Sequence, residues 1–385
     1  MANRHTPFEE WRKLADAVER HGEVNAAARE LGVKITTARS RYIAGKARYG
    51  DDPKRGMSPD HDMTHPVPDG YVVKGVSTLY DADGELKAQW VKSSIDQQRQ
   101  DEINRAALDA FKDKLPKAKP VKAPNQSNEN LAACYPIGDH HLGMLSWAEE
   151  TGADYDLSIG EEILAKASEH LISVVPPCGV CVIAILGDFM HYDSHQAMTP
   201  TNRNMLDTDT RFPKMVRAAI RSIRRMTETA LKRHAQVKII VEIGNHDLAS
   251  AIWLMECLSS HYDSEPRVSV DTSPMHYHYF RFGKCLVGTH HGDGAKMERL
   301  PLIMAMDRPE DWGQTEYRYW LTGHVHHDAV KDIDGCRVES FRILAPTDAW
   351  AANKGYRSAR DMKAIVYHKE YGEVARHVVN PSMVA

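Results

Sequence analysis

The stretch "GVCVIAILGDFMHYD", from Gly179 to Asp193, sets an apolar run directly before a polar segment. The run is short and ends at Gly187, which predicts a buried β-strand followed by a loop. The loop carries side chains that can bind a metal ion or move a proton, namely Asp188, His191 and Asp193. Such residues form a site only if other segments bring partners to them.

The same order of features, an apolar strand followed by Asp, Asn or His, occurs at four further places. "LAACYPI" precedes Asp139, His140 and His141; "VKIIVEI" precedes Asn245, His246 and Asp247; "KCLVGT" precedes His290, His291 and Asp293; and "YRYWLT" precedes His324, His326 and His327. Helical stretches separate the strands, and this alternation predicts an α/β fold with helices on the faces of a sheet. The carboxyl ends of such strands converge at one edge, where α/β proteins bind ligands.

A single histidine near a strand end is usually a hydrogen-bonded loop residue. Five clusters in register with five strands instead predict a metal site built from imidazole, carboxylate and amide ligands. This mixture suits Mn²⁺ best, with Fe, Zn²⁺ or Mg²⁺ as alternatives, whereas Ca²⁺ prefers shells made only of oxygen. Some seven candidate ligands are too many for one ion, so we expect two divalent ions that share a bridging carboxylate.

The motifs occur in the order D-x-H, G-D, G-N-H-D, H-G and G-H-x-H, and they span residues 131 to at least 345. In this order they resemble the calcineurin-like metallophosphoesterases. The resemblance implies a β-sandwich flanked by helices, with a dinuclear metal centre at one edge. It also implies two-metal hydrolysis of a phosphoester, in which a hydroxide activated by the metals attacks phosphorus.

Carried over by motif, the resemblance implies a role for each matching residue. The first metal would be held by Asp139, His141 and His326, the second by Asn245, His291 and His324, and Asp188 would bridge the two. His246 would donate a proton to the leaving oxygen, since histidine titrates near neutrality. His140, His290 and His327 each neighbour a proposed ligand, and we expect them to support the site or to lie at the surface.

The segment "GDFMH" is similar to the "GDLFH" of exonucleases that repair double-strand breaks in DNA. In that branch the final histidine orients the substrate phosphodiester, and His191 holds the matching position. His191 could equally be a hydrogen-bonding neighbour of the ligands. Protein phosphatases carry "GDxVDRG" and "GNHE", from which this chain departs at both places. Arg203 and Arg211, in the polar loop that follows, are candidate phosphate contacts.

Residues 1–50 predict three helices, and "GEVNAAARELGVKITTARSRYIAG" resembles a helix-turn-helix. Its second helix would present Lys34, Thr37, Arg39 and Arg41 to DNA. The segment carries ten Arg and Lys against six Asp and Glu, a net charge of +4 in a chain of net charge −4. The alternative is a helical bundle used for packing or for assembly of a homo-oligomer. A helix-turn-helix joined to a metallophosphoesterase looks like proteins of tailed bacteriophages.

Composition shifts predict three parts of the chain: residues 1–50, residues 51–130 and residues 131–385. The middle part is a Pro/Gly-rich linker with a β-hairpin over residues 70–92 and a flexible Lys/Pro-rich segment over residues 112–130. The last part carries every metal motif and is the predicted catalytic domain.

Hydrophobic content of 42% and a mean hydropathy of −0.50 are typical of a globular protein. No apolar run is long enough to cross a bilayer, and the first residues lack the apolar core of a signal peptide. We therefore expect a cytoplasmic protein with no membrane partner, in the host cytoplasm if a phage encodes it. Its six cysteines should be reduced, and the CxxC of Cys178 and Cys181 should belong to the core.

The sequence thus predicts a two-metal phosphodiesterase that cleaves DNA as an exo- or endonuclease. The alternative is a phosphatase or phosphodiesterase for small nucleotides or other phosphoesters, with the helical domain used for assembly. A DNA-binding regulator with a vestigial core is disfavoured, because every expected ligand position holds a competent residue.

Overall fold

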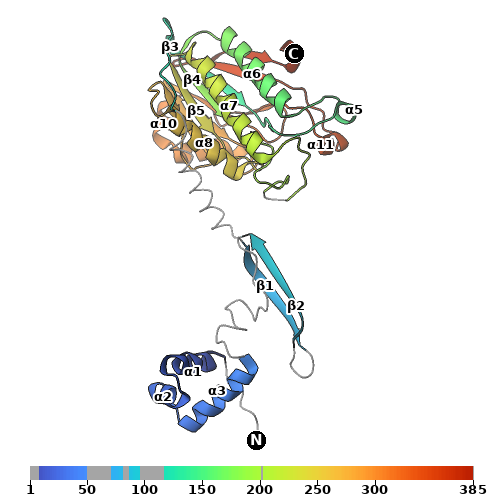
Figure 1. Cartoon of the computed structure of the whole chain (residues 1–385). Helices are drawn as coiled ribbons and strands as arrows, with labels where there is room; N and C mark the ends of the chain where they lie inside the picture. The colour runs from blue at the N-terminus through green and yellow to red at the C-terminus, as the bar shows by residue number, and fades with distance from the viewer. Residues whose placement is uncertain (1–7, 50–70, 81–85, 96–116, 201–202, 385) are drawn as a thin grey trace. The chain divides into compact units, whose positions relative to one another are not determined.

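The computed structural model describes residues 8–49, 71–80, 86–95, 117–200 and 203–384 (Figure 1). The chain divides into two compact units, Met1–Asp109 and Ala110–Ala385. The boundaries expected at residues 50 and 130 remain predictions. None of the described helices is long and apolar enough to cross a membrane.

The first unit begins with three helices and continues with two strands. The helices are α1 (Phe8–His21), α2 (Val24–Glu30) and α3 (Ile35–Tyr49), and the antiparallel strands are β1 (Tyr71–Tyr80) and β2 (Leu86–Ile95). The strands lie where the hairpin was expected, and its "DADG" turn falls outside the described residues. Leu14 and a set of alanines fill the helical core, so the three helices can approach closely.

Gly45 lies inside α3 because the buried Trp11 ring occupies the space that a Cβ would need. We therefore expect Gly45→Ala to destabilise the three helices by about 1–3 kcal/mol, although alanine has the higher helix propensity. Hydrogen exchange of α1–α3 in the full chain measures this effect as faster exchange. Ser40→Ala, at an exposed position of the same helix, is the control and should leave exchange nearly unchanged. Equal protection in the two variants would contradict the packing argument.

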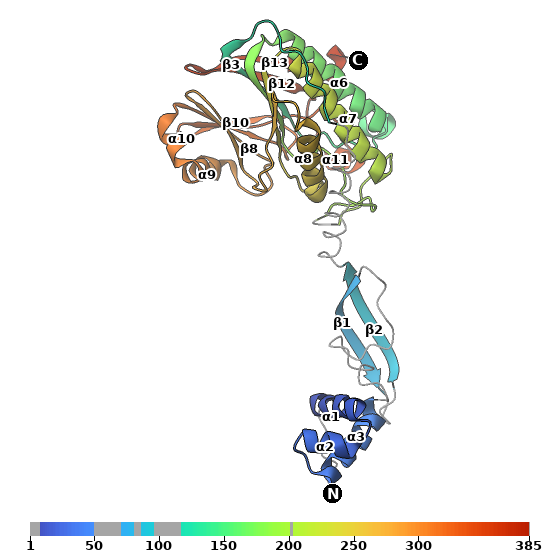
Figure 2. The ribbon, with the colours of Figure 1, turned by 60° about the vertical axis from the view of Figure 1, so that its left-hand side comes forward.

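The second unit contains two sheets (Figure 2). The first has the strand order β13-β12-β3-β4-β5-β6. Its strands are β3 (Asn128–Ile137), β4 (Cys178–Ile185), β5 (Gln236–Val241), β6 (Val268–Val270), β12 (Met362–His368) and β13 (Gly372–Val379). Strands β3 to β6 are parallel to one another, whereas β12 and β13 are antiparallel additions at one side.

The second sheet has the order β10-β11-β9-β8-β7. Its strands are β7 (His278–Phe282), β8 (Cys285–His290), β9 (Tyr317–Thr322), β10 (Ala329–Ile333) and β11 (Cys336–Ser340). The prediction of a mixed α/β fold is confirmed. The five motif-bearing strands are divided between the two sheets, because β8 and β9 belong to this second sheet.

The two sheets pack face to face, and β4 shows why its sequence is apolar throughout. Cys181, Ile183 and Ile185 join the core beneath the helices, while Val182 and Ala184 join the core between the sheets. Side chains alternate along a strand, so a strand covered on both faces needs apolar residues at every position.

Helices cover the outer faces of both sheets. The six-stranded sheet is covered by α6 (Leu157–Val174), α7 (Phe212–Leu231) and α8 (Leu248–Tyr262), and the five-stranded sheet by η1 (Met297–Arg299), α9 (Leu300–Asp307) and α10 (Pro309–Gln314). Short helices α5 (Ala148–Thr151) and α11 (Ala349–Asn353) pack together, and η2 (Pro381–Met383) follows β13. Proline in the first turn of α7 is compatible with a helix start, where no N–H partner is lost.

Residues 117–127, within the segment expected to be flexible, contact the end of α8 and the turn after it. Lys117 pairs with Asp263 at 2.8 Å, and the Val121 N–H donates to Glu265 at 2.6 Å. All six cysteines are free and buried, and burial raises the pKa of the Cys178 thiol to about 12. The Cys178 and Cys181 pair therefore has the character of core residues.

Candidate metal centre

The loops that follow β3, β4, β5, β8 and β9 meet at one edge of the sandwich and bring donor atoms together. Asp139, His141 and His326 form one group, with ligand atoms within 4.8 Å of one another. The Nε2 atoms of His141 and His326 face each other at 3.2 Å. The Asp139 carboxylate is fully buried and accepts the His324 N–H at 2.8 Å.

A second group contains Asp188, His291 and His324, again within 4.8 Å. Nε2 of His291 lies 3.3 Å from Asp188 Oδ2 and 3.1 Å from Asn245 Oδ1. Its Nδ1–H donates to the Leu186 carbonyl at 2.8 Å, so Nε2 is the ring atom turned toward the Asp188 carboxylate. A ring held in this way presents one atom as a metal ligand.

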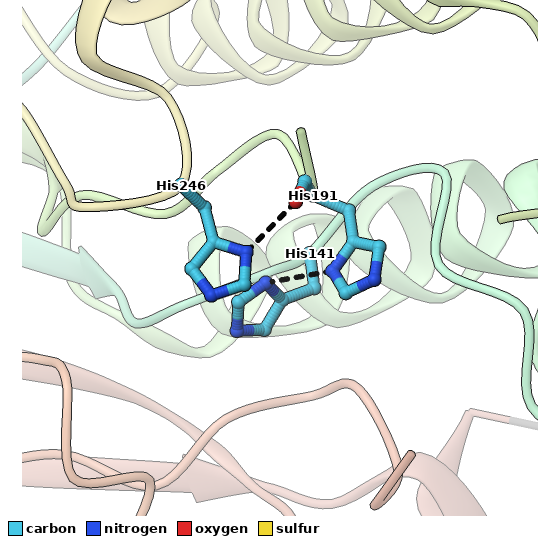
Figure 3. Close-up of side chains that lie close together, drawn as sticks. All are labelled: His141, His191 and His246. Atoms are coloured by element: carbon cyan, nitrogen blue, oxygen red, sulfur yellow. Dashed lines mark hydrogen bonds between the residues drawn. The ribbon is translucent and has the colours of Figure 1, made fainter. Parts of the chain in front are cut away.

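Three histidine rings form the third group, His141, His191 and His246 (Figure 3). Nδ1 of His191 lies 3.2 Å from Nδ1 of His141, and Nδ1–H of His246 donates to the His191 carbonyl at 2.8 Å. Nε2 of His191 is buried without a hydrogen-bond partner in the described part of the chain. Burial and the charge of His246 lower the pKa of His191 well below its usual value, and the Asp207 backbone opposes this shift.

Backbone strain concentrates at the same loops. Among the described residues, six that are not glycine adopt positive φ: His141, Asp188, Arg203, His324, His326 and Asp334. Four of the six are proposed ligands, and each such conformation costs on the order of 1 kcal/mol or more. Strain of this kind persists where the surrounding structure holds a functional geometry, which indicates that these loops are shaped for a site.

Two motif glycines are required by close approach to the carboxylates. A Cβ on Gly244 would overlap the Asp188 carboxylate, and a Cβ on Gly323 would lie 2.5 Å from Asp139 Oδ2. The glycines of the G-N-H-D and G-H-x-H motifs therefore make room for the groups that would carry the negative charge of the site.

The carboxylates and imidazoles also shift one another's protonation. Burial would raise the pKa of Asp139, but His326 and His291 outweigh it and hold the value at about 2. Burial would lower the pKa of His291, but Asp188 raises it to about 10. Burial and the neighbouring histidines lower the pKa of His141 well below its usual value. In the absence of metal, Asp139 is thus ionised, His141 is neutral and His291 holds a proton shared with Asp188, which a bound cation would displace.

These donors fit two divalent cations. Two ring nitrogens that face each other at 3.2 Å repel unless one is protonated, whereas a cation accepts both lone pairs. The two groups each hold one aspartate, and His291 lies within 4 Å of both carboxylates. The structure brings together all seven predicted ligands, and the assignment of each to a metal remains a prediction.

Two further aspartates of the motifs, Asp247 and Asp193, accept backbone hydrogen bonds next to the site. Asp247 accepts hydrogen bonds from the backbone N–H groups of Asp188, Phe189, Met190 and Gly244, at 2.9–3.2 Å. Asp193 instead accepts the N–H groups of Ala249 and Ser250 and so caps α8. Both residues stand in the motif loops of the sequence, but their hydrogen bonds to the backbone could not be predicted from it. No local signal shows them, because each acts across more than fifty residues except for the bond to Gly244.

The three histidines next to proposed ligands have separate environments. His140 is buried beneath α6, where its Nε2 lies 3.0 Å from the Gly160 carbonyl, and burial lowers its pKa to about 4. His290 is buried and stacks on Tyr277. His327 is exposed and bonds to the Val325 carbonyl. We expected these histidines either to support the site or to lie at the surface. His327 lies at the surface, whereas His140 and His290 are buried.

The predicted phosphate and DNA contacts lie outside these groups. Arg203 and Arg211 are exposed, and Arg211 immediately precedes α7. In the first unit Lys34 is exposed and Thr37 is half-buried. Two further predicted contacts have partners within the helices, because Arg39 donates to Asn25 at 3.2 Å and Arg41 pairs with Glu10 at 3.1 Å.

Comparison with known proteins gave structural likenesses only. No family model matches the sequence, and no curated protein matches it. A predicted phosphoesterase from Streptococcus pneumoniae is similar at 8% identity and a TM-score of 0.27, over 65% of this chain and 97% of that one. Vps29 from Entamoeba histolytica, complexed with Zn²⁺, is similar at 11% identity and a TM-score of 0.27, over 65% of this chain and 99% of that one. At such values function must be inferred from the chain's own residues.

Proposed function

We propose that the chain is a two-metal phosphodiesterase that hydrolyses DNA. The observation that carries the proposal is the pair of adjacent donor groups, Asp139 with His141 and His326, and Asp188 with His291 and His324. Asn245 adds an amide oxygen 3.1 Å from His291. This mixed donor set favours Mn²⁺, with Fe, Zn²⁺ and Mg²⁺ as alternatives.

When bound, the two cations would neutralise the phosphate charge and supply an activated water molecule as nucleophile. The protein's own part is to hold the donors and to manage protons. Asp188 keeps His246 in place by accepting its backbone N–H at 2.7 Å. Nδ1–H of His246 is bound to the His191 carbonyl, so the proton for the leaving oxygen would be a second one, carried on Nε2 of the imidazolium, and its loss would leave the neutral ring.

His191 is proposed to orient the substrate. If His141 donates its Nδ1–H to Nδ1 of His191, the His191 proton lies on Nε2. That N–H has no hydrogen-bond partner in the described part of the chain, and a phosphate oxygen is a suitable acceptor. The likeness of "GDFMH" to the exonuclease motif is a second argument for this proposed role.

The substrate assignment to DNA rests on the first unit. Its α2, a turn at Gly32 with positive φ, and α3 have the order of a helix-turn-helix, and residues 1–50 carry net charge +4. Lys34 and Thr37 are the proposed base-edge or phosphate contacts. Arg39 and Arg41 would have to exchange their partners Asn25 and Glu10 for DNA. Arg203 and Arg211 are proposed phosphate contacts of the second unit.

The alternative is hydrolysis of small nucleotides, with the helices used to assemble a homo-oligomer. The full chain with Mn²⁺ should be given linear, circular and single-stranded DNA, and in parallel bis-p-nitrophenyl phosphate and p-nitrophenyl phosphate. The DNA proposal expects cleavage of DNA and of the bis-ester. Turnover of the monoester with no DNA cut would instead favour the alternative.

His246→Ala is expected to lower kcat on bis-p-nitrophenyl phosphate by roughly 10²–10⁴-fold, because it removes the proposed proton donor. Bound metal, measured on the purified variant, should remain near the wild-type level. His327→Ala is the matched control, since this exposed histidine lies on a neighbouring loop outside the three groups. A kcat for His246→Ala within threefold of the control would contradict the role.

A further inference from the structure

Helix α7 carries a line of exposed positive charge. Exposed basic residues recur at intervals of three or four, which places them on one face of the helix and of the turn before it: Arg211, Lys214, Arg217, Arg221 and Arg225. The helix itself holds five basic residues and one acidic residue, a net charge of +4 in a chain of net charge −4. The line therefore contrasts with the balance of the whole protein.

The two ends of this line differ in their partners. Arg221 forms a bidentate pair with Glu161 of α6, and Arg225 pairs with Glu169. Arg211, Lys214 and Arg217 have no ion pair or side-chain hydrogen bond in the part of the chain that the structure describes. Asp209 attracts Lys214, but its Oδ2 is already bound to the Leu157 N–H at 3.0 Å. Three basic side chains at the amino-terminal end thus lack an ion-pair partner among the described residues.

That end of α7 adjoins the metal centre. The Leu145 N–H donates to the Asp207 carbonyl at 3.0 Å, and the Asp209 N–H to the Gly143 carbonyl at 3.3 Å. A Cβ on Gly143, two residues beyond His141, would lie 2.7 Å from the Met215 sulfur in the first turn of α7. The loop that holds His141 is therefore packed against the start of the basic line.

We propose that Arg211, Lys214 and Arg217 bind the sugar–phosphate backbone of a nucleic acid strand where it passes the metal centre. This inference rests on the proposed function and adds a binding surface to it. Unpaired cations in a line along one helix suit a polyanionic strand, and each phosphate contact releases bound counterions. An anionic membrane is disfavoured, because the apolar face of α7 is buried against the sheet and cannot insert into lipid.

The test compares Lys214→Gln/Arg217→Gln with Lys119→Gln/Lys122→Gln in the full chain. Lys119 and Lys122 are exposed and lie near Glu265, at the edge of the sheet where the strands begin. The control substitutions therefore remove the same charge at a place away from the metal centre. Binding of a fluorescent single-stranded oligonucleotide is measured by anisotropy over a range of salt concentrations. Removing two phosphate contacts should weaken binding roughly tenfold or more and reduce the salt slope by about 1.4, with no such change in the control.

Measurements of cleavage show whether a failure lies in this binding surface or in the proposed function. For the Lys214→Gln/Arg217→Gln variant, kcat/KM should fall at least roughly tenfold further on DNA than on bis-p-nitrophenyl phosphate. An unchanged salt slope in an active enzyme would overturn the backbone contact alone. A reduced slope in a protein that hydrolyses no phosphoester would support the contact and overturn the proposed function. Loss of binding to phosphatidylserine vesicles with intact oligonucleotide binding would assign the surface to a membrane and overturn the proposal.

Discussion

Asp188→Asn is expected to lower phosphodiesterase activity by roughly 10³-fold, because it removes the negative charge that the two donor groups would share. The amide keeps the size of the side chain, and Oδ1 can still accept the His246 N–H. The variant should therefore fold, with a far-ultraviolet circular dichroism spectrum like that of the wild type. Metal content measured by mass spectrometry should fall below two ions per chain.

Asp293→Asn is the matched control for this substitution. Asp293 is an exposed carboxylate on the loop after β8 and belongs to none of the three donor groups. Its removal should change activity and metal content by less than threefold. If Asp188→Asn keeps more than a tenth of wild-type activity, the assignment of Asp188 as the shared carboxylate is wrong.

Asp247→Ala is expected to reduce the free energy of unfolding by about 4 kcal/mol or more. The carboxylate satisfies four buried backbone N–H groups, and an unsatisfied buried donor costs roughly 1–3 kcal/mol. Three of these donors belong to the segment from Asp188 to Met190, so the loop that positions Asp188 should lose its conformation. Thermal unfolding and metal content should therefore both decrease.

Asp193→Ala separates this effect from the loss of any aspartate that accepts backbone N–H groups. Asp193 accepts the N–H groups that begin α8, whereas the N–H groups of Asp188 to Met190 are bound by Asp247. Loss of a cap costs about 0.5–2 kcal/mol and should leave metal content near the wild-type level. Equal losses of stability and metal in the two variants would remove the case for Asp247 as the positioning residue.

The sequence predicted the strands that carry the site and the chemistry of their loops. Strand β4 and the Asp188 that follows it could be found because an apolar run and the polar loop after it are local features. The same reasoning found Asp139, Asn245 and His291. Their convergence also follows from a general property of α/β folds, in which the carboxyl ends of strands meet.

Tertiary structure decided which sheet each strand joins and which way each neighbouring side chain points. Strands β8 and β9 form a second sheet, although their sequences resemble those of β3 to β5. His140 and His141 are adjacent in sequence, yet one contacts the Gly160 carbonyl beneath α6 and the other faces His326. Such differences depend on contacts between residues far apart in the chain, which local pattern does not contain.

The candidate ligand types, histidine, aspartate and asparagine after successive strands, were thus predicted from the sequence alone, because they follow local apolar runs at fixed spacing. The supporting hydrogen bonds of Asp247, the positive φ of His141 and the unpaired charge of Lys214 were decided only in the folded chain. Each depends on what packing brings alongside the residue, whether a backbone N–H, a constrained loop or the lack of an ion-pair partner among the described residues.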